Sequence, residues 1–212
     1  MVPLTNPSAS AGPVGTVLRN GITRVTHGGT EVCYRFVTEH DDVEAITTLL
    51  HEAYAPLATA GMHFVASHQS AAVTRERMAM GDTVVALVDT RVIGTVTLRT
   101  LENTSGGWFY DRADVASFGQ YAVAPSYQGQ GIGTTLLDFV EALARERGVS
   151  FLALDTSEHA HGLIQYYEAR GFRFVDYHRW PEVNYRSVRL AKPLSASDLD
   201  MVIGRSPEAE RR

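Results

Sequence analysis

The chain has 212 residues, of which 44% are hydrophobic and 20% are charged, and its formal net charge at pH 7 is −5. This length accommodates one domain with extensions or two small ones, and the composition is that of an ordinary globular protein. The negative balance disfavours a general nucleic-acid binder, which presents a basic face. No apolar run approaches the ~20 residues that span a membrane, and no signal peptide is evident. We therefore expect a cytoplasmic protein without membrane or nucleic-acid partners.

The expected organisation is one domain between two polar ends. Residues 1–30 are rich in Pro, Ser, Gly and Thr, which predicts a flexible N-terminal arm with a short strand near residues 16–18. His27–Gly29 has the composition of a turn before the first confident strand. Residues 195–212 are polar and predict a mobile tail. The predicted domain therefore covers residues 31–194.

The single cysteine, Cys33, excludes an internal disulfide and fits a reducing compartment. It lies in residues 32–37, whose apolar and polar residues alternate as in a strand. We therefore interpret Cys33 as a buried strand thiol rather than a nucleophile.

Helical and strand patterns alternate along the rest of the domain. The first half predicts helices over residues 41–56, where Pro56 would end the helix, and 69–80, followed by a hairpin of residues 83–88 and 92–98 and a loop over 103–114. The second half predicts strands over 118–123, 151–155, 172–180 and 185–190, with helices from 132 to Gly148 and over 161–170. A strand–helix–strand order implies a parallel pair. The expected architecture is one α/β domain with a mixed sheet.

Three glycines at positions 129, 131 and 133 lie where a strand becomes a helix, and residues 128–134 are called the glycine turn below. The first N–H groups of a helix lack partners and attract anions. The turn lacks the lysine of a Walker A motif. It also fails the dinucleotide fingerprint, because Thr134 stands where the third glycine would be.

Residues 123–137, with the pattern VAP-x2-QGQGIG-x2-LL, resemble the acetyl-CoA-binding motif of the GNAT superfamily of N-acetyltransferases. A second signature of that family, a tyrosine four residues before Gly-Phe, occurs at Tyr167. The resemblance covers about residues 32–192. It implies a mixed, mostly antiparallel twisted sheet with helices on both faces and a central, splayed parallel strand pair. It also implies acetyl-CoA as the co-substrate and no metal.

The resemblance also implies roles for individual residues. The pyrophosphate would rest on N–H groups of residues 129–134, and the pantetheine arm would pair with the strand that ends at Val123. The residues expected to bind the co-substrate are Tyr121, Ala122, Val123, Gln128, Gly129, Gln130, Gly131, Ile132, Gly133 and Thr134. The Val123 N–H would stabilise the oxyanion, and Tyr167 would protonate the leaving thiolate. The alternative for Tyr167 is a core tyrosine.

The general base and the acceptor pocket stay open at this point. Candidates for the base are Glu52, Glu102, Asp114 and His161, or a water chain. Ala160 stands near the place where the family often has an asparagine. Aromatic residues could form an acceptor wall, or else pack within a hairpin or a dimer contact: Trp108, Phe109, Tyr110, Trp180 and Tyr185, with Asn184, Arg186 and the loop 57–64.

The predicted function is transfer of an acetyl group from acetyl-CoA to a primary amine of a small molecule by direct transfer in a ternary complex. A metabolite, an amino acid or an antibiotic such as an aminoglycoside would be the acceptor. The alternatives are a protein N-terminus or lysine as acceptor, or a CoA-binding sensor without turnover. A homodimer is also left open.

Overall fold

A computed structural model describes residues 21–195 of the chain. These residues form one eight-stranded sheet with the order β1-β2-β3-β4-β5-β6-β8-β7. The strands are β1 (Thr23–His27), β2 (Thr30–Phe36), β3 (Gly81–Val88), β4 (Arg91–Arg99), β5 (Val115–Val123), β6 (Phe151–Ser157), β7 (Arg173–His178) and β8 (Ser187–Pro193). All neighbouring strands are antiparallel except β5 and β6, which confirms the predicted mixed, mostly antiparallel sheet.

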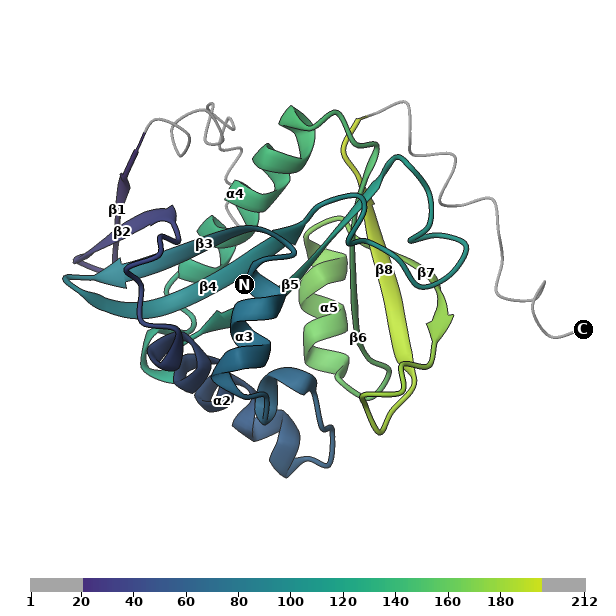
Figure 1. Ribbon diagram of the computed structural model, residues 1–212, viewed down its shortest axis with the longest axis horizontal. Helices are drawn as coiled ribbons and strands as arrows, with labels where there is room; N and C mark the ends of the chain where they lie inside the picture. The colour runs from purple at the N-terminus through teal and green to yellow at the C-terminus, as the bar shows by residue number, and fades with distance from the viewer. Residues whose placement is uncertain (1–20, 196–212) are drawn as a thin grey trace, which may run out of the picture.

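The described helices cover the sheet and connect its strands. They are α2 (Val43–Thr59), α3 (Ala71–Met78), α4 (Ile132–Glu146) and α5 (His161–Ala169), with short 3-10 turns η1 (Val65–Ser67) and η2 (Pro125–Tyr127). Figure 1 shows α3 in front of the sheet and α4 behind it, so helices lie on both faces as predicted.

The parallel strands β5 and β6 pair only over their first halves. Three residue pairs join them, from Val115 opposite Phe151 to Ser117 opposite Ala153. Further along, the register between β4 and β5 shifts at Gln120. The backbone of Gln120 has a φ of +48°, which is uncommon outside glycine. Such a bulge bends a strand, so β5 turns away from β6 and leaves a gap.

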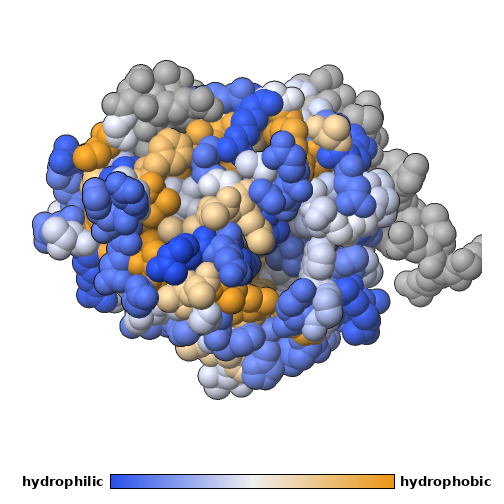
Figure 2. All heavy atoms as spheres, viewed as in Figure 1, coloured by the Kyte–Doolittle hydropathy of each residue, from blue (hydrophilic) through white to orange (hydrophobic). Residues whose placement is uncertain are grey.

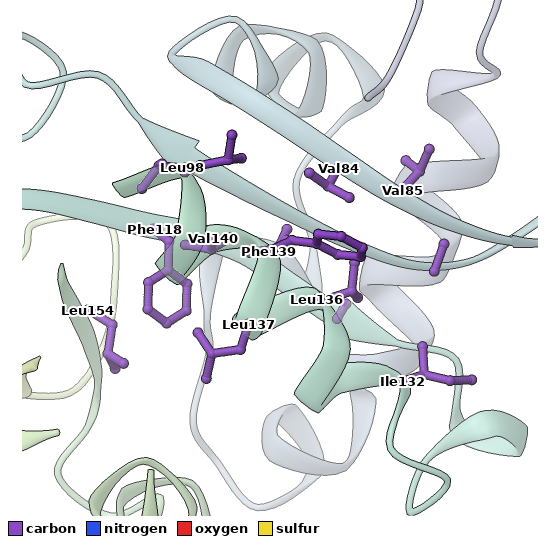
Figure 3. Packing of buried hydrophobic residues seen from close by; sticks show 14 of the residues in the cluster. Val84, Val85, Leu98, Phe118, Ile132, Leu136, Leu137, Phe139, Val140 and Leu154 are labelled. Carbon is purple, nitrogen blue, oxygen red and sulfur yellow. The ribbon is translucent and has the colours of Figure 1, made fainter. Parts of the chain in front are cut away.

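The main core lies between α4 and the central strands. Leu136, Phe139 and Val140 of α4 are fully or almost fully buried, and Figure 3 shows them beside residues of the neighbouring strands. Burying each such side chain contributes about 1.5–3 kcal/mol. Gly94 of β4 lets the helix approach closely, because a Cβ there would lie 3.0 Å from Leu136 Cδ1. This packing holds the start of α4, and with it the glycine turn, against the end of β5.

Two predictions about the first half of the chain are wrong. Residues 23–27 belong to strand β1, although the sequence placed them in a flexible arm; β1 pairs with β2 around a turn at Gly28 and Gly29. Helix α2 continues through Pro56 to Thr59. Proline lacks an N–H and its ring crowds the carbonyl four residues earlier, but the Pro56 carbonyl still accepts from the Ala60 N–H at 3.1 Å, so the last turn of the helix forms. The predicted strand near residues 16–18 and most of the predicted tail lie outside the described residues.

The other predicted elements have the predicted type, with boundaries moved by a few residues. Helix α3 is shorter than the predicted segment 69–80, and β5 begins at Val115 instead of Phe118. On the face shown in Figure 2, hydrophilic residues surround smaller hydrophobic areas, as is usual for a protein surface. Within residues 21–195, no helix is both long and apolar enough to cross a membrane.

Candidate active site

A pocket of about 580 Å³ lies beside the end of β5 and is called the donor pocket. Its walls come from α2, the end of β5, the glycine turn and α5. Of the ten residues predicted to bind the co-substrate, all except Gln130 and Ile132 line it. The side chain of Ile132 is buried in the core, and that of Gln130 donates to the Ser126 carbonyl at 3.1 Å.

The backbone of the glycine turn has the conformation that only glycine adopts easily. Gly129 and Gly131 have φ values of +74° and +89°. Gly131 is the N-cap of α4, and the first N–H that bonds back into the helix is that of Thr135, which donates to the Gly131 carbonyl at 3.0 Å. The N–H groups of residues 132–134 therefore stay available to an anion at a helix N-terminus.

A contact from β1 supports the glycine turn, and the sequence did not predict it. The ring of His27 donates from Nδ1 to the Gln130 carbonyl at 3.1 Å. Its Nε2 lies 2.7 Å from the Tyr34 hydroxyl, which fixes the orientation of the ring. A histidine next to a Gly-Gly turn gave no sign of this role, because its partner is 103 residues away in sequence.

The edge of β5 that faces the gap presents the Val123 N–H, while its carbonyls accept hydrogen bonds from side chains. The Ala124 N–H donates to Ile93 of β4 at 2.8 Å. Because successive N–H groups of a strand point to opposite edges, the Val123 N–H points away from β4. On that same edge, the Tyr121 carbonyl accepts from the Tyr54 hydroxyl at 3.1 Å, and the Val123 carbonyl accepts from the Gln128 side chain at 2.9 Å.

Tyr167 lies on α5 among aromatic rings and is 6% exposed. Its ring centroid is 5.7 Å from that of Phe172 and 6.1 Å from that of Phe118. Burial first, and then the neighbouring Tyr54, Tyr166 and Asp155, raise its pKa well above the usual value. No hydrogen-bond partner for the Tyr167 hydroxyl occurs within residues 21–195.

A second pocket of about 540 Å³ adjoins the first and is called the acceptor pocket. It extends from the gap between β5 and β6 toward α3, the end of β4 and residues 182–185. Three residues line both pockets: Tyr54, Leu163 and Tyr167. The Tyr167 side chain therefore lies where the two pockets meet.

Asp155, near the end of β6, lines the acceptor pocket together with Tyr167. Its carboxylate accepts long hydrogen bonds of 3.4 Å from the hydroxyls of Tyr110 and Ser187. The sequence contained a signal that was missed, because a charged residue at the carboxyl end of a short, buried parallel strand is a common place for a functional group. By contrast, none of the four residues considered as the base, Glu52, Glu102, Asp114 and His161, lines either pocket.

The predicted aromatic wall forms only in part. Trp180 and Tyr185 line the acceptor pocket, as does Phe64 from the loop that was grouped with them. Tyr185 packs on Phe64 with ring centroids 4.8 Å apart. In contrast, Phe109 and Tyr110 are buried in a separate core cluster.

Trp108 and the two polar residues grouped with that wall, Asn184 and Arg186, have structural partners. The Trp108 indole donates to Asp176 at 2.7 Å, and Arg186 pairs with Glu158. Asn184 bonds the backbone at Gly61 and His63. These three residues therefore hold surrounding segments in place.

Comparison with known proteins gives the family. The model of the Acetyltransferase (GNAT) family matches residues 44–172. The S-(2-succino)cysteine N-acetyltransferase of Bacillus subtilis (strain 168) is 30% identical over 141 residues, which are 66% of this chain and 82% of that protein. The chain belongs to the GNAT family. It is an acetyl-CoA-dependent N-acetyltransferase.

Solved GNAT structures share the fold of this enzyme. The ribosomal-protein-S18-alanine N-acetyltransferase of Escherichia coli superposes with a TM-score of 0.59 at 19% identity, covering 77% of this chain and 94% of that one. A GNAT acetyltransferase of Elizabethkingia anophelis with acetyl-CoA bound gives a TM-score of 0.55 at 18% identity, over 76% and 97% of the two chains. Among the residues that the structure describes, no group of three or more His, Cys, Asp or Glu could hold a metal ion.

Proposed function

We propose that this GNAT enzyme transfers an acetyl group from acetyl-CoA directly to the primary amine of a small molecule, with both substrates bound at once. The observation that carries this proposal is the meeting of the donor and acceptor pockets at Tyr167. Two adjoining pockets that share Tyr54, Leu163 and Tyr167 would let a thioester and an amine approach one another without an enzyme-bound intermediate. The only cysteine, Cys33, lines neither pocket, which favours direct transfer.

The donor pocket supplies groups suited to acetyl-CoA. The N–H groups at the start of α4 would hold the pyrophosphate, since they are the unpaired donors of a helix N-terminus. The Val123 N–H would stabilise the oxyanion that forms when the amine attacks the acetyl carbonyl, because a fixed donor directed at developing charge favours the transition state. The glycines leave room for the phosphate groups to approach the backbone.

Asp155 and Tyr167 would handle the protons. As the C–N bond forms and the C–S bond breaks, the ammonium proton would pass to the Asp155 carboxylate, and the leaving thiolate would take a hydrogen bond or a proton from Tyr167. The raised pKa of Tyr167 keeps its phenol neutral. The conjugate acid of a thiolate has a pKa of about 8.5. Full proton transfer from Tyr167 therefore costs about 1.4 kcal/mol for each unit by which the pKa of Tyr167 exceeds that of the thiol. Tyr167 therefore acts mainly as a hydrogen-bond donor to the thiolate.

The acceptor pocket suits a small molecule. Its volume of about 540 Å³ lies within the range of roughly 300–1,000 Å³ that is usual for small-molecule sites. The Bacillus subtilis relative is an S-(2-succino)cysteine N-acetyltransferase. An amino acid or a substituted amino acid with a free α-amine is therefore the proposed acceptor class.

The test is thiol release from acetyl-CoA over a panel of amines. The panel includes S-(2-succino)cysteine, unsubstituted amino acids, an aminoglycoside and peptides with free N-termini. We expect release with the amino acid class and intersecting lines in double-reciprocal plots at varied concentrations of both substrates. Parallel lines would indicate an acetyl-enzyme and contradict direct transfer. Release with peptides alone would replace the small-molecule acceptor with a protein N-terminus.

A further inference from the structure

Two arginines from different elements converge within the acceptor pocket. Arg77 lies on α3 and Arg99 at the end of β4, and both line the pocket. A Cβ at Gly119 would lie 3.0 Å from Arg99 Nη2 and 3.7 Å from Arg77 Nη2. Glycine at this position of β5 therefore leaves the space into which both guanidinium groups point.

Neither arginine has an anionic partner. No carboxylate within residues 21–195 forms an ion pair with Arg77 or Arg99, although most of the other half-buried arginines have one. Arg77 donates to the Gln69 side chain at 2.5 Å, and Arg99 reaches only the Ser117 hydroxyl at 3.5 Å. Burial, followed by the positive charge of Arg99, lowers the pKa of Arg77, but arginine stays charged in proteins.

Placing two unpaired cations side by side in a half-buried site is costly unless an anion joins them. A guanidinium presents a planar fork of N–H groups that matches a carboxylate. The acidic residues that line the same pocket do not fill this role. Glu76 and Glu182 are exposed to solvent, where their charges are screened. Asp155 attracts Arg77 less strongly than Arg99 repels it, and it forms an ion pair with neither guanidinium.

We propose that Arg77 and Arg99 form a carboxylate subsite that selects acidic amino-acid acceptors, whose amine then lies toward Asp155. The acceptor pocket then carries positive charge from Arg77 and Arg99 and negative charge from the Asp155 carboxylate. An amino acid with a second carboxylate on its side chain complements both charges. This inference rests on the proposed function for the identity of the acceptor, but the subsite itself can be tested by binding alone.

The test compares acids with their esters in the full-length enzyme. The probes are S-(2-succino)cysteine and S-(carboxymethyl)cysteine, each beside its fully methyl-esterified form, with binding measured by calorimetry in the presence of CoA and turnover by thiol release. We expect the acids to bind more tightly than the esters. We also expect Arg99→Met to raise the Kd and KM of the acids by about 10- to 100-fold, the scale of lost charge-assisted hydrogen bonds, with little change for the esters.

Three further variants sharpen the comparison. Arg99→Lys keeps the charge without the fork and should recover part of the preference for acids. Arg75→Met removes an exposed arginine from the same helix as Arg77 and should leave the preference unchanged. Arg77→Met should act like Arg99→Met, with thermal unfolding as the check that its loss of the Gln69 bond has not disrupted α3.

The outcomes separate this inference from the proposed function. Turnover of acids and esters at equal efficiency, unchanged in Arg99→Met, overturns the subsite and leaves the acetyltransfer proposal standing. Arginine-dependent binding of acids without turnover of any panel amine supports the subsite and overturns the proposed acceptor class. Equal binding of acids and esters to wild type and Arg99→Met overturns the subsite whatever the turnover.

Discussion

The Tyr121 hydroxyl lies directly against the bare Cα of Gly133, so that a Cβ on Gly133 would be only 2.7 Å from the Tyr121 oxygen. The Tyr121 hydroxyl is also 2.9 Å from the hydroxyl of Tyr166 on α5. The end of β5, the first turn of α4 and α5 therefore meet at one point. Glycine at position 133 is required by this contact, and in the proposed donor site it also leaves room for a phosphate.

Gly133→Ala should weaken the binding of acetyl-CoA. The new methyl group would push Tyr121 from its place in the donor pocket, and we expect the KM for acetyl-CoA to rise about tenfold, which corresponds to about 1.4 kcal/mol. Steady-state kinetics with varied acetyl-CoA measure this change. Gly162→Ala is the matched control: a Cβ there meets no atom within 4 Å, and the change should be neutral or stabilise by about 0.4–1 kcal/mol.

A double-mutant cycle tests the cause of that effect. In a Tyr121→Phe background the clashing oxygen is absent, and the Cβ would lie 3.5 Å from the ring carbon that carried it. Gly133→Ala should then change the KM much less than it does in the wild-type background. An equal effect in both backgrounds would mean that the methyl group acts on the bound phosphate instead of on Tyr121.

Tyr167→Phe should lower kcat by about 10²-fold, the scale expected when a hydrogen bond to the leaving thiolate is lost, with little change in the affinity for acetyl-CoA. Single-turnover rates measure the chemical step even if product release limits kcat. Tyr166→Phe removes a hydroxyl from the neighbouring position of α5, and because that hydroxyl contacts Tyr121 we expect it to alter the KM more than kcat. An unchanged single-turnover rate in Tyr167→Phe would reduce Tyr167 to a core residue.

Asp155→Asn should lower kcat/KM for the amine by about 10²–10⁴-fold near neutral pH, because the amide cannot take the ammonium proton. The deficit should narrow as the pH rises past the pKa of the amine itself, since the acceptor is then already neutral. The pH profiles of variant and wild type, with the CoA affinity as a check on folding, measure this. A deficit that is constant with pH would indicate that Asp155 only positions the amine.

The Asp41 carboxylate, which precedes α2, should make the free energy of unfolding depend on pH in the acidic range. Arg35 donates two hydrogen bonds of 2.7 Å to it, and the Thr38 N–H donates a third of the same length. The bonds from Arg35 are the main cause of the lowered pKa of Asp41. Because the pKa is lower in the folded state, the stabilisation is complete above the unfolded value of about 3.9 and is lost as the pH falls through the folded value.

Asp41→Asn should therefore cost about 1–3 kcal/mol in the free energy of unfolding at pH 7, with the difference from wild type shrinking as the pH falls below about 4. Urea unfolding at pH 7 and at pH 3 measures both values. The neighbouring Asp42 caps α2 through the Ala45 N–H, and Asp42→Asn retains a good N-cap. This control should unfold like the wild type at pH 7.

Much of the fold followed from local pattern. The apolar stripe of α4 and the short apolar strand β6 were predictable because each is set by its own side chains. Strand β1 escaped prediction because its side chains are exposed or half-buried and show little apolar alternation. The bulge at Gln120 was also beyond the sequence, since the Gln120 side chain accepts a hydrogen bond of 2.9 Å from the side chain of Gln69, which is distant in the chain.

The candidate site also has one part that the sequence could predict and one part that it could not. Most of the residues that line the donor pocket could be named from the sequence, because the glycines of the turn mark the place where a strand becomes a helix. The polar residues of the acceptor pocket were not predictable, because Asp155, Arg77 and Arg99 come from three separate elements and only the tertiary fold brings them together. No local spacing records such a juxtaposition.

The two pockets share Tyr54, Leu163 and Tyr167, and no residue of the glycine turn lines the acceptor pocket. If the pockets hold the two substrates as proposed, substitutions on α3, at the end of β4 or in residues 182–185 should alter which amine is accepted while the use of the thioester is preserved. Variation at these positions would then change the acceptor without changing the acetyl source. The splayed sheet would thus place the residues that contact the thioester and those that select the amine on different parts of the fold.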